Sequence, residues 1–412
     1  MPPAPGRAFF VTLMTLTLLM NTIGRGVTET FAVFLLPVEQ ALQVSRSEIS
    51  ATYSIYMLVH GLAAPFAGQL VDRLGARVTY ATGLILLGSA YVSASFAENI
   101  WHYYLTAGAL SGLGAASLGM VVASSLLSRW FTRGLGAMMA IPYAAVGAGM
   151  LVIPPLSQYL LTFMTWREAH LTLGLGVLCL LPLIVLLPLG RMTRGSDEWR
   201  EMRERATADG GRVWTASRAI RTGAFWALFG VYFFTSVAAY AVLPQSVAFL
   251  VERGFDPLLA AGAFGMTGAL SAVGIIAIGW LSDRAGRVAA IVISKISTIT
   301  GILCLLAIAW VKSDALLYAF VFFFGLMQGA RGPVITVMVA ILFRGGSVGT
   351  IFGTLSMALG LGAGLGSWAS GALHDLTGSY VASFSFAAAA SFTGLMCYVL
   401  SPSLRLERPA EL

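Results

Sequence analysis

Charge is scarce in this sequence. Of its 412 residues, 10% are Asp, Glu, Lys or Arg, against roughly 25% in ordinary soluble domains. Hydrophobic residues make up 58% of the chain, and 46 residues are glycine. A soluble fold of this length could not enclose so much apolar surface, whereas glycine is frequent in membrane helices. The composition therefore excludes a soluble protein and predicts one embedded in a lipid bilayer.

Cysteines and catalytic motifs are also scarce. The three cysteines, Cys179, Cys304 and Cys397, lie inside apolar runs without the spacing of a metal site or a disulfide framework. The sequence has no glycine-rich phosphate loop, no metal-ligand cluster and no nucleophile–base set. We therefore predict no enzyme activity, no metal and no cofactor. The net charge of +7 does not indicate nucleic acid binding, since the arginines lie in short loops between apolar runs.

Long apolar runs are abundant. Each is long enough to cross about 30 Å of hydrocarbon as a helix, and too long for a strand of a membrane barrel. Lipid leaves open backbone groups unpaired, so helices are expected. We predict an all-α membrane protein with twelve transmembrane helices, near residues 8–36, 46–71, 78–98, 100–128, 136–164, 168–190, 223–251, 256–282, 288–311, 313–342, 346–372 and 378–401.

The positive charges are distributed unevenly between the loops. If the lead at residues 1–7 is cytoplasmic, 18 of the 25 Lys and Arg residues fall on that side and four fall in the opposite loops. Cytoplasmic loops of membrane proteins carry such an excess. The distribution predicts that both termini are cytoplasmic, as an even number of spans requires.

One long segment contains no apolar run. Residues 191–222 are polar and mixed in charge, and they separate six predicted spans from six others. We predict a six-helix bundle over 1–190, a cytoplasmic linker over 191–222 and a second six-helix bundle over 223–412. Alternating acidic and basic residues make a surface helix possible within the linker.

A short motif occurs twice. Residues 68–77 (GQLVDRLGAR) and 279–287 (GWLSDRAGR) share the pattern G-x-L-x-D-R-x-G, 211 residues apart, each after the second span of its half. Such repetition indicates an internally duplicated architecture. Glycine permits a tight turn, and the carboxylate can accept from helix ends or pair across the bundles. We predict a conformational gate formed by Gly68, Asp72, Arg73, Gly75, Arg77, Gly279, Asp283, Arg284, Gly286 and Arg287.

The doubled motif resembles the hallmark cytoplasmic loop of the major facilitator superfamily, and the layout of six plus six spans agrees over essentially the whole chain. Five further fragments resemble the bacterial members of the monocarboxylate-transporter and oxalate–formate-antiporter branch. They lie at 45–50 (SRSEIS), 129–133 (RWFTR), 166–169 (WREA), 329–333 (GARGP) and 375–380 (DLTGSY).

The resemblance implies a secondary transporter that works by alternating access. Its substrate would be a small carboxylate, moved with a proton or exchanged for a counter-anion. It further implies a monomer in the bacterial inner membrane. The chain departs from the branch in two respects. The position that commonly carries a carboxylate-binding arginine in span eight is Ile275, and span eleven lacks the lysine that some anion exchangers carry.

Ionisable residues inside the spans are few, and such residues are functional candidates by default. Arg25 and Glu29 are four residues apart on one helix face and can pair. A substrate carboxylate would compete for Arg25 while Glu29 takes up a proton; the alternative is a purely structural salt bridge. Arg331 lies among Gly329, Gly332 and Pro333, and its guanidinium suits bidentate capture of a carboxylate. The alternative role of Arg331 is to bond carbonyls freed by Pro333.

Other polar residues in the spans are weaker candidates. His60 could relay protons or serve only in packing, and Lys295 is expected to extend toward the cytoplasm. The remaining candidates are aromatic and amide side chains that could contact substrate: Asn21, Tyr53, Tyr56, Tyr143, Tyr232, Tyr240 and Gln328.

Three functions remain open from the sequence. The leading hypothesis is a transporter of a small organic anion, by proton symport or anion exchange. The first alternative is a proton-coupled exporter of drugs or other apolar compounds, which would need Glu29 but not Arg331. A remote alternative is a membrane sensor that does not transport.

Overall fold

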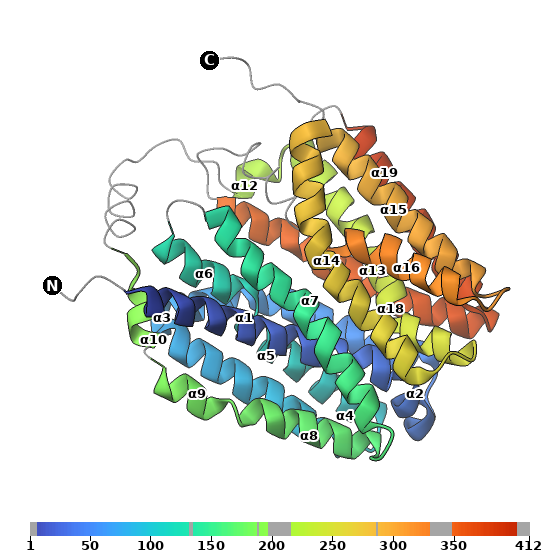
Figure 1. The fold of residues 1–412 in the computed structure, drawn as a ribbon, viewed down its shortest axis with the longest axis horizontal. Helices are drawn as coiled ribbons and strands as arrows, with labels where there is room; N and C mark the ends of the chain where they lie inside the picture. The colour runs from blue at the N-terminus through green and yellow to red at the C-terminus, as the bar shows by residue number, and fades with distance from the viewer. Residues whose placement is uncertain are drawn as a thin grey trace.

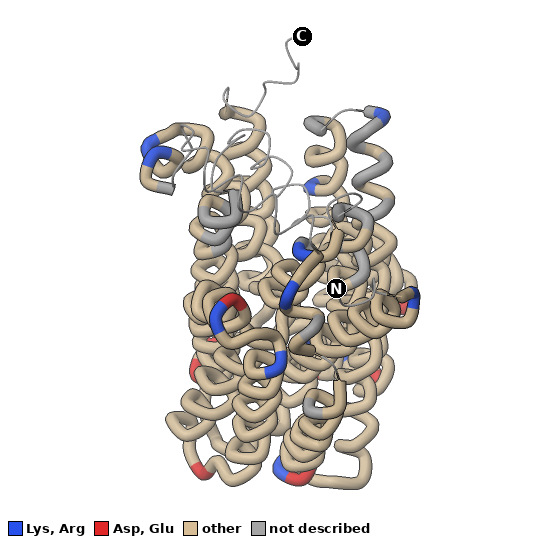
Figure 2. Tube along the Cα trace, turned by 90° about the vertical axis from the view of Figure 1, so that its left-hand side faces the viewer, with Lys and Arg blue, Asp and Glu red and all other residues tan. Residues whose placement is uncertain are grey.

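The computed structural model of the protein describes residues 6–131, 135–187, 189–196, 216–285, 287–329 and 348–401. Within these ranges all regular structure is helical (Figure 1). Eight helical stretches in them are long and apolar enough to cross a membrane. Figure 2 shows Lys, Arg, Asp and Glu at only a few places on the described chain.

The helices of the first half follow the first six predicted spans, with several local breaks. They are α1 (Arg7–Glu29), α2 (Phe31–Leu42), α3 (Arg46–Ala94), α4 (Ile100–Tyr103), the π-helix η1 (Tyr104–Leu110), α5 (Ser111–Leu118), α6 (Met120–Trp130), α7 (Leu135–Leu160), α8 (Trp166–Leu178), α9 (Leu181–Leu186) and α10 (Leu189–Arg194).

The described helices of the second half follow the remaining spans, except the short helix at Ala216–Ala219, which lies in the predicted linker. They are α12 (Ala216–Ala219), α13 (Gly223–Glu252), α14 (Pro257–Ala285), α15 (Arg287–Ala307), α16 (Asp314–Gln328), α18 (Val348–Thr377) and α19 (Tyr380–Val399). Most of the predicted linker lies outside the described residues.

Spans two and three are joined within the single helical stretch α3. The junction is Gly75, whose backbone is non-helical with φ of +84° and ψ of 170°. Residues with a Cβ rarely adopt this conformation, whereas glycine does so readily. The second glycine of the repeated motif is therefore where the chain reverses between two spans.

Two helices begin at a capping box. The Ser45 side chain accepts from the backbone N–H of Glu48, and the Glu48 carboxylate accepts in return from the N–H of Ser45. Thr165 and Glu168 make the same reciprocal pair at the start of α8. Each pair satisfies backbone donors that the first turn leaves open. The sequences SRSE (45–48) and TWRE (165–168) are therefore explained locally, because each supplies the capping box at the start of its helix.

Among the described helices, the two halves pack most extensively through three pairs: α3 with α18, α7 with α14, and α2 with α13. Within the first half, α1 packs closely on α7. A Cβ built on Gly26 would lie 2.9 Å from the Gly149 Cα atom. Any side chain at either position would force these two helices apart.

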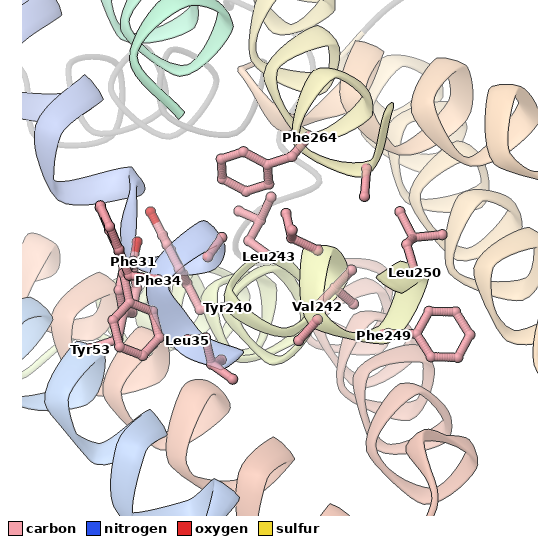
Figure 3. Close-up of a cluster of buried hydrophobic side chains, with 14 of the residues drawn as sticks. Phe31, Phe34, Leu35, Tyr53, Tyr240, Val242, Leu243, Phe249, Leu250 and Phe264 are labelled. Carbon is pink, nitrogen blue, oxygen red and sulfur yellow. The ribbon is translucent and has the colours of Figure 1, made fainter. Parts of the chain in front are cut away.

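The apolar core is arranged differently at the two ends of the molecule. We call one end of the molecule the near end: α1 begins there, and α10 and α12 lie there (Figure 1). The opposite end, with the α2–α3, α13–α14 and α18–α19 connections, is the far end. The largest buried cluster reaches the far end and joins Phe34 and Tyr53 to Tyr240, Phe249 and Phe264 (Figure 3).

At the near end, the described residues form separate clusters in the two halves. One contains Leu13, Val71 and Leu126 of the first half. Another contains Phe225 and Tyr398 of the second half. Among the described residues, the halves are thus joined by one continuous core toward the far end, and each half has its own core toward the near end.

Candidate functional site

The centre of the site is the ion pair between Arg25 and Glu29. An Arg25 Nη2 atom lies 2.6 Å from a Glu29 carboxylate oxygen, and the side chains are 18% and 2% exposed, respectively. Both residues lie in the last turns of α1, one helical turn apart. The structure therefore contains the ion pair that the spacing predicts, buried within the protein.

Three tyrosines surround this ion pair. Arg25 donates to the Tyr240 hydroxyl at 2.5 Å and to the Tyr56 hydroxyl at 3.4 Å, and Tyr53 donates to the Glu29 carboxylate at 2.9 Å. Tyr53 and Tyr56 belong to α3, whereas Tyr240 belongs to α13 of the other half. The rings of Tyr53 and Tyr240 lie 5.9 Å apart (Figure 3). The site is thus assembled from both halves of the protein.

This arrangement can bind an anion and a proton at adjacent atoms. The guanidinium offers a rigid fork of donors that fits a carboxylate. Glu29 already occupies part of that fork, so a second carboxylate would compete with it. Protonation of Glu29 would remove the competing charge, because a neutral carboxyl attracts the guanidinium much less.

Two of the predicted substrate contacts, Asn21 and Gln328, make hydrogen bonds to residues outside the Arg25–Glu29 ion pair and its tyrosines. The Asn21 side-chain amide donates to the Thr17 carbonyl within α1 at 2.9 Å. The Gln328 amide contacts the Met150 sulfur at 3.7 Å. Tyr232 is buried in α13 and Tyr143 is half-buried in α7.

The remaining ionisable candidates have different positions. His60 is half-buried in α3, with its ring 5.8 Å from that of Tyr56. Lys295 does not extend to the surface as expected. It is 6% exposed, and its ammonium donates to the Thr235 hydroxyl. Arg331 lies outside the described residues.

A small cavity that sequence reasoning missed lies beside the ion pair. It is lined by Thr52, Tyr53 and Tyr56 of α3, together with Tyr103 and His170. The cavity has room for about one water molecule. The π-helix η1 contributes to its wall, and such helices occur often at functional sites. The hydroxyl of Thr52 is buried there without a partner.

His170 is held firmly in the wall of this cavity. One ring nitrogen lies 2.9 Å from the Trp166 carbonyl and the other lies 3.1 Å from the Tyr103 hydroxyl. Because a carbonyl can only accept, the Nδ1 atom donates to Trp166. When Tyr103 donates to the Nε2 atom, the ring carries one proton and is neutral. His170 follows directly after the WREA fragment, which is the signal that could have drawn attention to it.

The first copy of the repeated motif lies at the near end. Asp72 is 63% exposed, and it pairs with Arg129 of the same half. Arg129 also donates to the Thr193 carbonyl at 2.7 Å. Arg77 donates to the Leu187 carbonyl at 2.9 Å, and Arg73 is exposed. The ion pair between Asp72 and Arg129 therefore lies within one half.

The glycines of this copy have separate roles. A Cβ built on Gly68 would lie 3.3 Å from a Val121 methyl group, and Gly75 provides the positive φ. In the second copy, Gly279 belongs to α14 and Arg284 is exposed. Gly286 lies outside the described residues, as do the side chains of Asp283 and Arg287.

The chain matches known transporters over most of its length. The sequence profile of the Major Facilitator Superfamily matches residues 14–330. The chain is 30% identical to monocarboxylate transporter 13 of Rattus norvegicus, over 100% of this chain and 94% of that protein. It is 25% identical to the uncharacterized MFS-type transporter YcxA of Bacillus subtilis (strain 168), over 92% of both.

Solved structures show the same fold. The crystal structure of a D-xylose–proton symporter has a TM-score of 0.75 at 12% identity, covering 96% of this chain and 99% of that chain. A bacterial homologue of the human lysosomal transporter Spinster, inward-facing and occupied, has a TM-score of 0.70 at 16% identity, covering 97% and 100%. The all-α membrane fold of twelve helices in two bundles is thus supported. The chain belongs to the Major Facilitator Superfamily, in its monocarboxylate-transporter branch.

Proposed function

We propose that this protein is a secondary active transporter of a small organic anion of the monocarboxylate type. The observation that carries the proposal is the buried Arg25–Glu29 ion pair, which contacts Tyr240 of the opposite half. A guanidinium kept inside a membrane protein needs partners that offset its insertion penalty. A site shared by two halves is where alternating access requires the substrate to bind.

The proposed cycle uses competition for one guanidinium. With Glu29 ionised, Arg25 is held by its neighbour. Protonation of Glu29 frees donors of Arg25 for the substrate carboxylate, so that proton and anion move together. Exchange of two anions requires only that one carboxylate replaces another at Arg25, so both symport and anion exchange are compatible with this site. Arg331 and His60 remain proposed contributors to substrate and proton binding, respectively.

The orientation follows from the positive loops. We place both termini in the cytoplasm of a bacterial inner membrane, which puts the near end inside and the far end outside. The continuous core at the far end then corresponds to a state closed toward the outside. The proposed functional unit is one chain, because both bundles are present in it.

A second function is favoured by one feature of the site. The Met57 sulfur lies 4.0 Å from an Arg25 nitrogen, and aromatic rings surround the pair. Soft, apolar surroundings of this kind suit drugs or other apolar compounds. The span that contains Ile275 also has no charge in its interior. A proton-coupled exporter would use Glu29 as its proton carrier. It would not need Arg25 to be released from Glu29 for substrate binding.

The experiment that separates these functions is transport in proteoliposomes. Radiolabelled organic acids and lipophilic amines are supplied at two external pH values. The proposal predicts accumulation of at least one monocarboxylate, increased when the outside is acidic or when a counter-anion is preloaded. Transport of amines without any carboxylate would overturn it in favour of the exporter.

A further inference from the structure

Arg46 lies at the far end, where it contacts both halves of the protein. This first residue of α3 is 3% exposed. Its guanidinium contacts Glu39 of its own half at 2.8 Å and Glu252 of the other half at 2.7 Å. It also donates to the hydroxyl of Tyr380, at the start of α19. Four helices therefore converge on a single cation.

The same helix end is held a second time from across the interface. The Asp375 carboxylate accepts from the backbone N–H of Arg46 at 3.0 Å and from that of Ser47 at 2.7 Å. A carboxylate at the first turn of a helix satisfies open donors and interacts favourably with the helix dipole. Here the capping carboxylate comes from α18, which belongs to the other half.

These contacts could not survive separation of the halves at the far end. Glu252, Tyr380 and Asp375 belong to the second half, whereas Arg46 and Ser47 belong to the first. The Arg46 side chain is buried, whereas the Glu252 side chain is 37% exposed and Asp375 is exposed. Charge-assisted hydrogen bonds are among the stronger polar contacts. At the near end, by contrast, the Asp72–Arg129 pair lies within one half and does not oppose separation.

We propose that Arg46, Glu252, Tyr380 and Asp375 form a latch that holds the far end closed and so sets the balance between the two access states. The inference rests on the proposed function, because a transporter must open this latch in every cycle. These are positioning residues that act through the arrangement of the bundles. Glu39 stays with Arg46 when the latch opens and keeps the guanidinium paired.

The test measures how often the far end opens. Ser367 is fully buried, and its hydroxyl donates across the halves to the Ser50 carbonyl. A cysteine at position 367, in a chain whose native cysteines are serine, should react with a membrane-impermeant maleimide only when the far end opens. The reagent is added from the far side of the membrane, and the reaction rate reports the open fraction.

The variants separate the latch from simple loss of charge. Glu252→Gln combined with Tyr380→Phe removes two contacts of Arg46. It should raise the reaction rate at least about tenfold, which is the effect of losing one charge-assisted contact. The matched control is Glu39→Gln, which removes a carboxylate charge from the same guanidinium within the first half and keeps Glu252, Tyr380 and Asp375 in place. It should change the rate less than about twofold. Thermal unfolding of each variant checks that the chain is folded.

Two outcomes would overturn the latch. One is an unchanged rate in the folded double variant, and the other is equal opening by Glu39→Gln. Spin labels at Val78 and Ile293, exposed near-end positions in the two halves, test the proposed function separately. Alternating access predicts that the near end closes as the far end opens. An open far end with unchanged near-end distances would support the latch but contradict alternating access.

Discussion

At the scale of single residues, the central feature is the position of Arg25 between Gly24 and Gly26. A Cβ at Gly24 would lie 2.9 Å from the Leu118 Cβ atom, and one at Gly26 would lie 2.9 Å from Gly149. The two glycines bring neighbouring helices close to α1 on both sides of the arginine. The guanidinium is left to face α3 and α13, where Tyr56 and Tyr240 accept its hydrogen bonds.

The first prediction concerns Arg25. Removing a charge-assisted hydrogen bond should weaken anion binding by about 1.5–3 kcal/mol, roughly ten- to a hundredfold in affinity. Arg25→Ala should show this loss. Arg25→Lys should be intermediate, because it keeps the charge and loses the fork. Equilibrium binding in detergent measures both, with Lys312→Ala at the far end as a control that also removes a positive charge. Parental affinity in a folded Arg25→Ala protein would contradict the assignment.

The second prediction concerns Arg331, and its basis is the sequence around this residue. An arginine among glycines and Pro333 within a span carries an insertion penalty of at least roughly 2.5–3.5 kcal/mol, so we expect it to bind a partner. Arg331→Ala should reduce anion affinity about as much as Arg25→Ala does. If it reduces thermal stability while anion affinity stays parental, its role is to bond the backbone carbonyls near Pro333.

At the scale of helices, the apolar runs predicted the described elements well, and local chemistry explains the differences. Periodicity cannot show that spans two and three join without a loop, since that depends on the φ of Gly75. The T-x-x-E pattern at Thr165 could have predicted the start of α8 more sharply, because a capping box is a local motif. The π-helix η1 has no simple sequence signal.

The third prediction concerns the helix connection at the first motif. Asp72→Asn removes the charge that pairs with Arg129 and should loosen α3 from α6. Because the change affects the arrangement of helices and leaves the site intact, transport should slow while substrate affinity remains within about threefold. Single-turnover efflux and equilibrium binding separate these quantities. Loss of binding with a normal rate per occupied site would show that Asp72 belongs to the substrate site.

At the scale of the whole molecule, the apolar runs and the internal repeat sufficed to predict the fold. They did not predict which side chains meet across the two halves. Tyr240 was one of seven weak candidates, and only the packing of the second half against the first, with α13 on α2, brings its hydroxyl to Arg25. Glu39, Glu252 and Tyr380 were not predicted to meet Arg46, because no spacing rule relates residues that are up to 334 positions apart.

The central claim is that Glu29 and the substrate compete for Arg25 between the two bundles. The direct test is anion affinity of the parent and of Glu29→Gln at acidic and alkaline pH. The parent should bind more tightly at acidic pH, by about tenfold, because a neutral Glu29 releases the guanidinium. Glu29→Gln should bind at both pH values as tightly as the parent does at acidic pH. A Glu29→Gln protein that keeps the parental pH dependence would contradict the account.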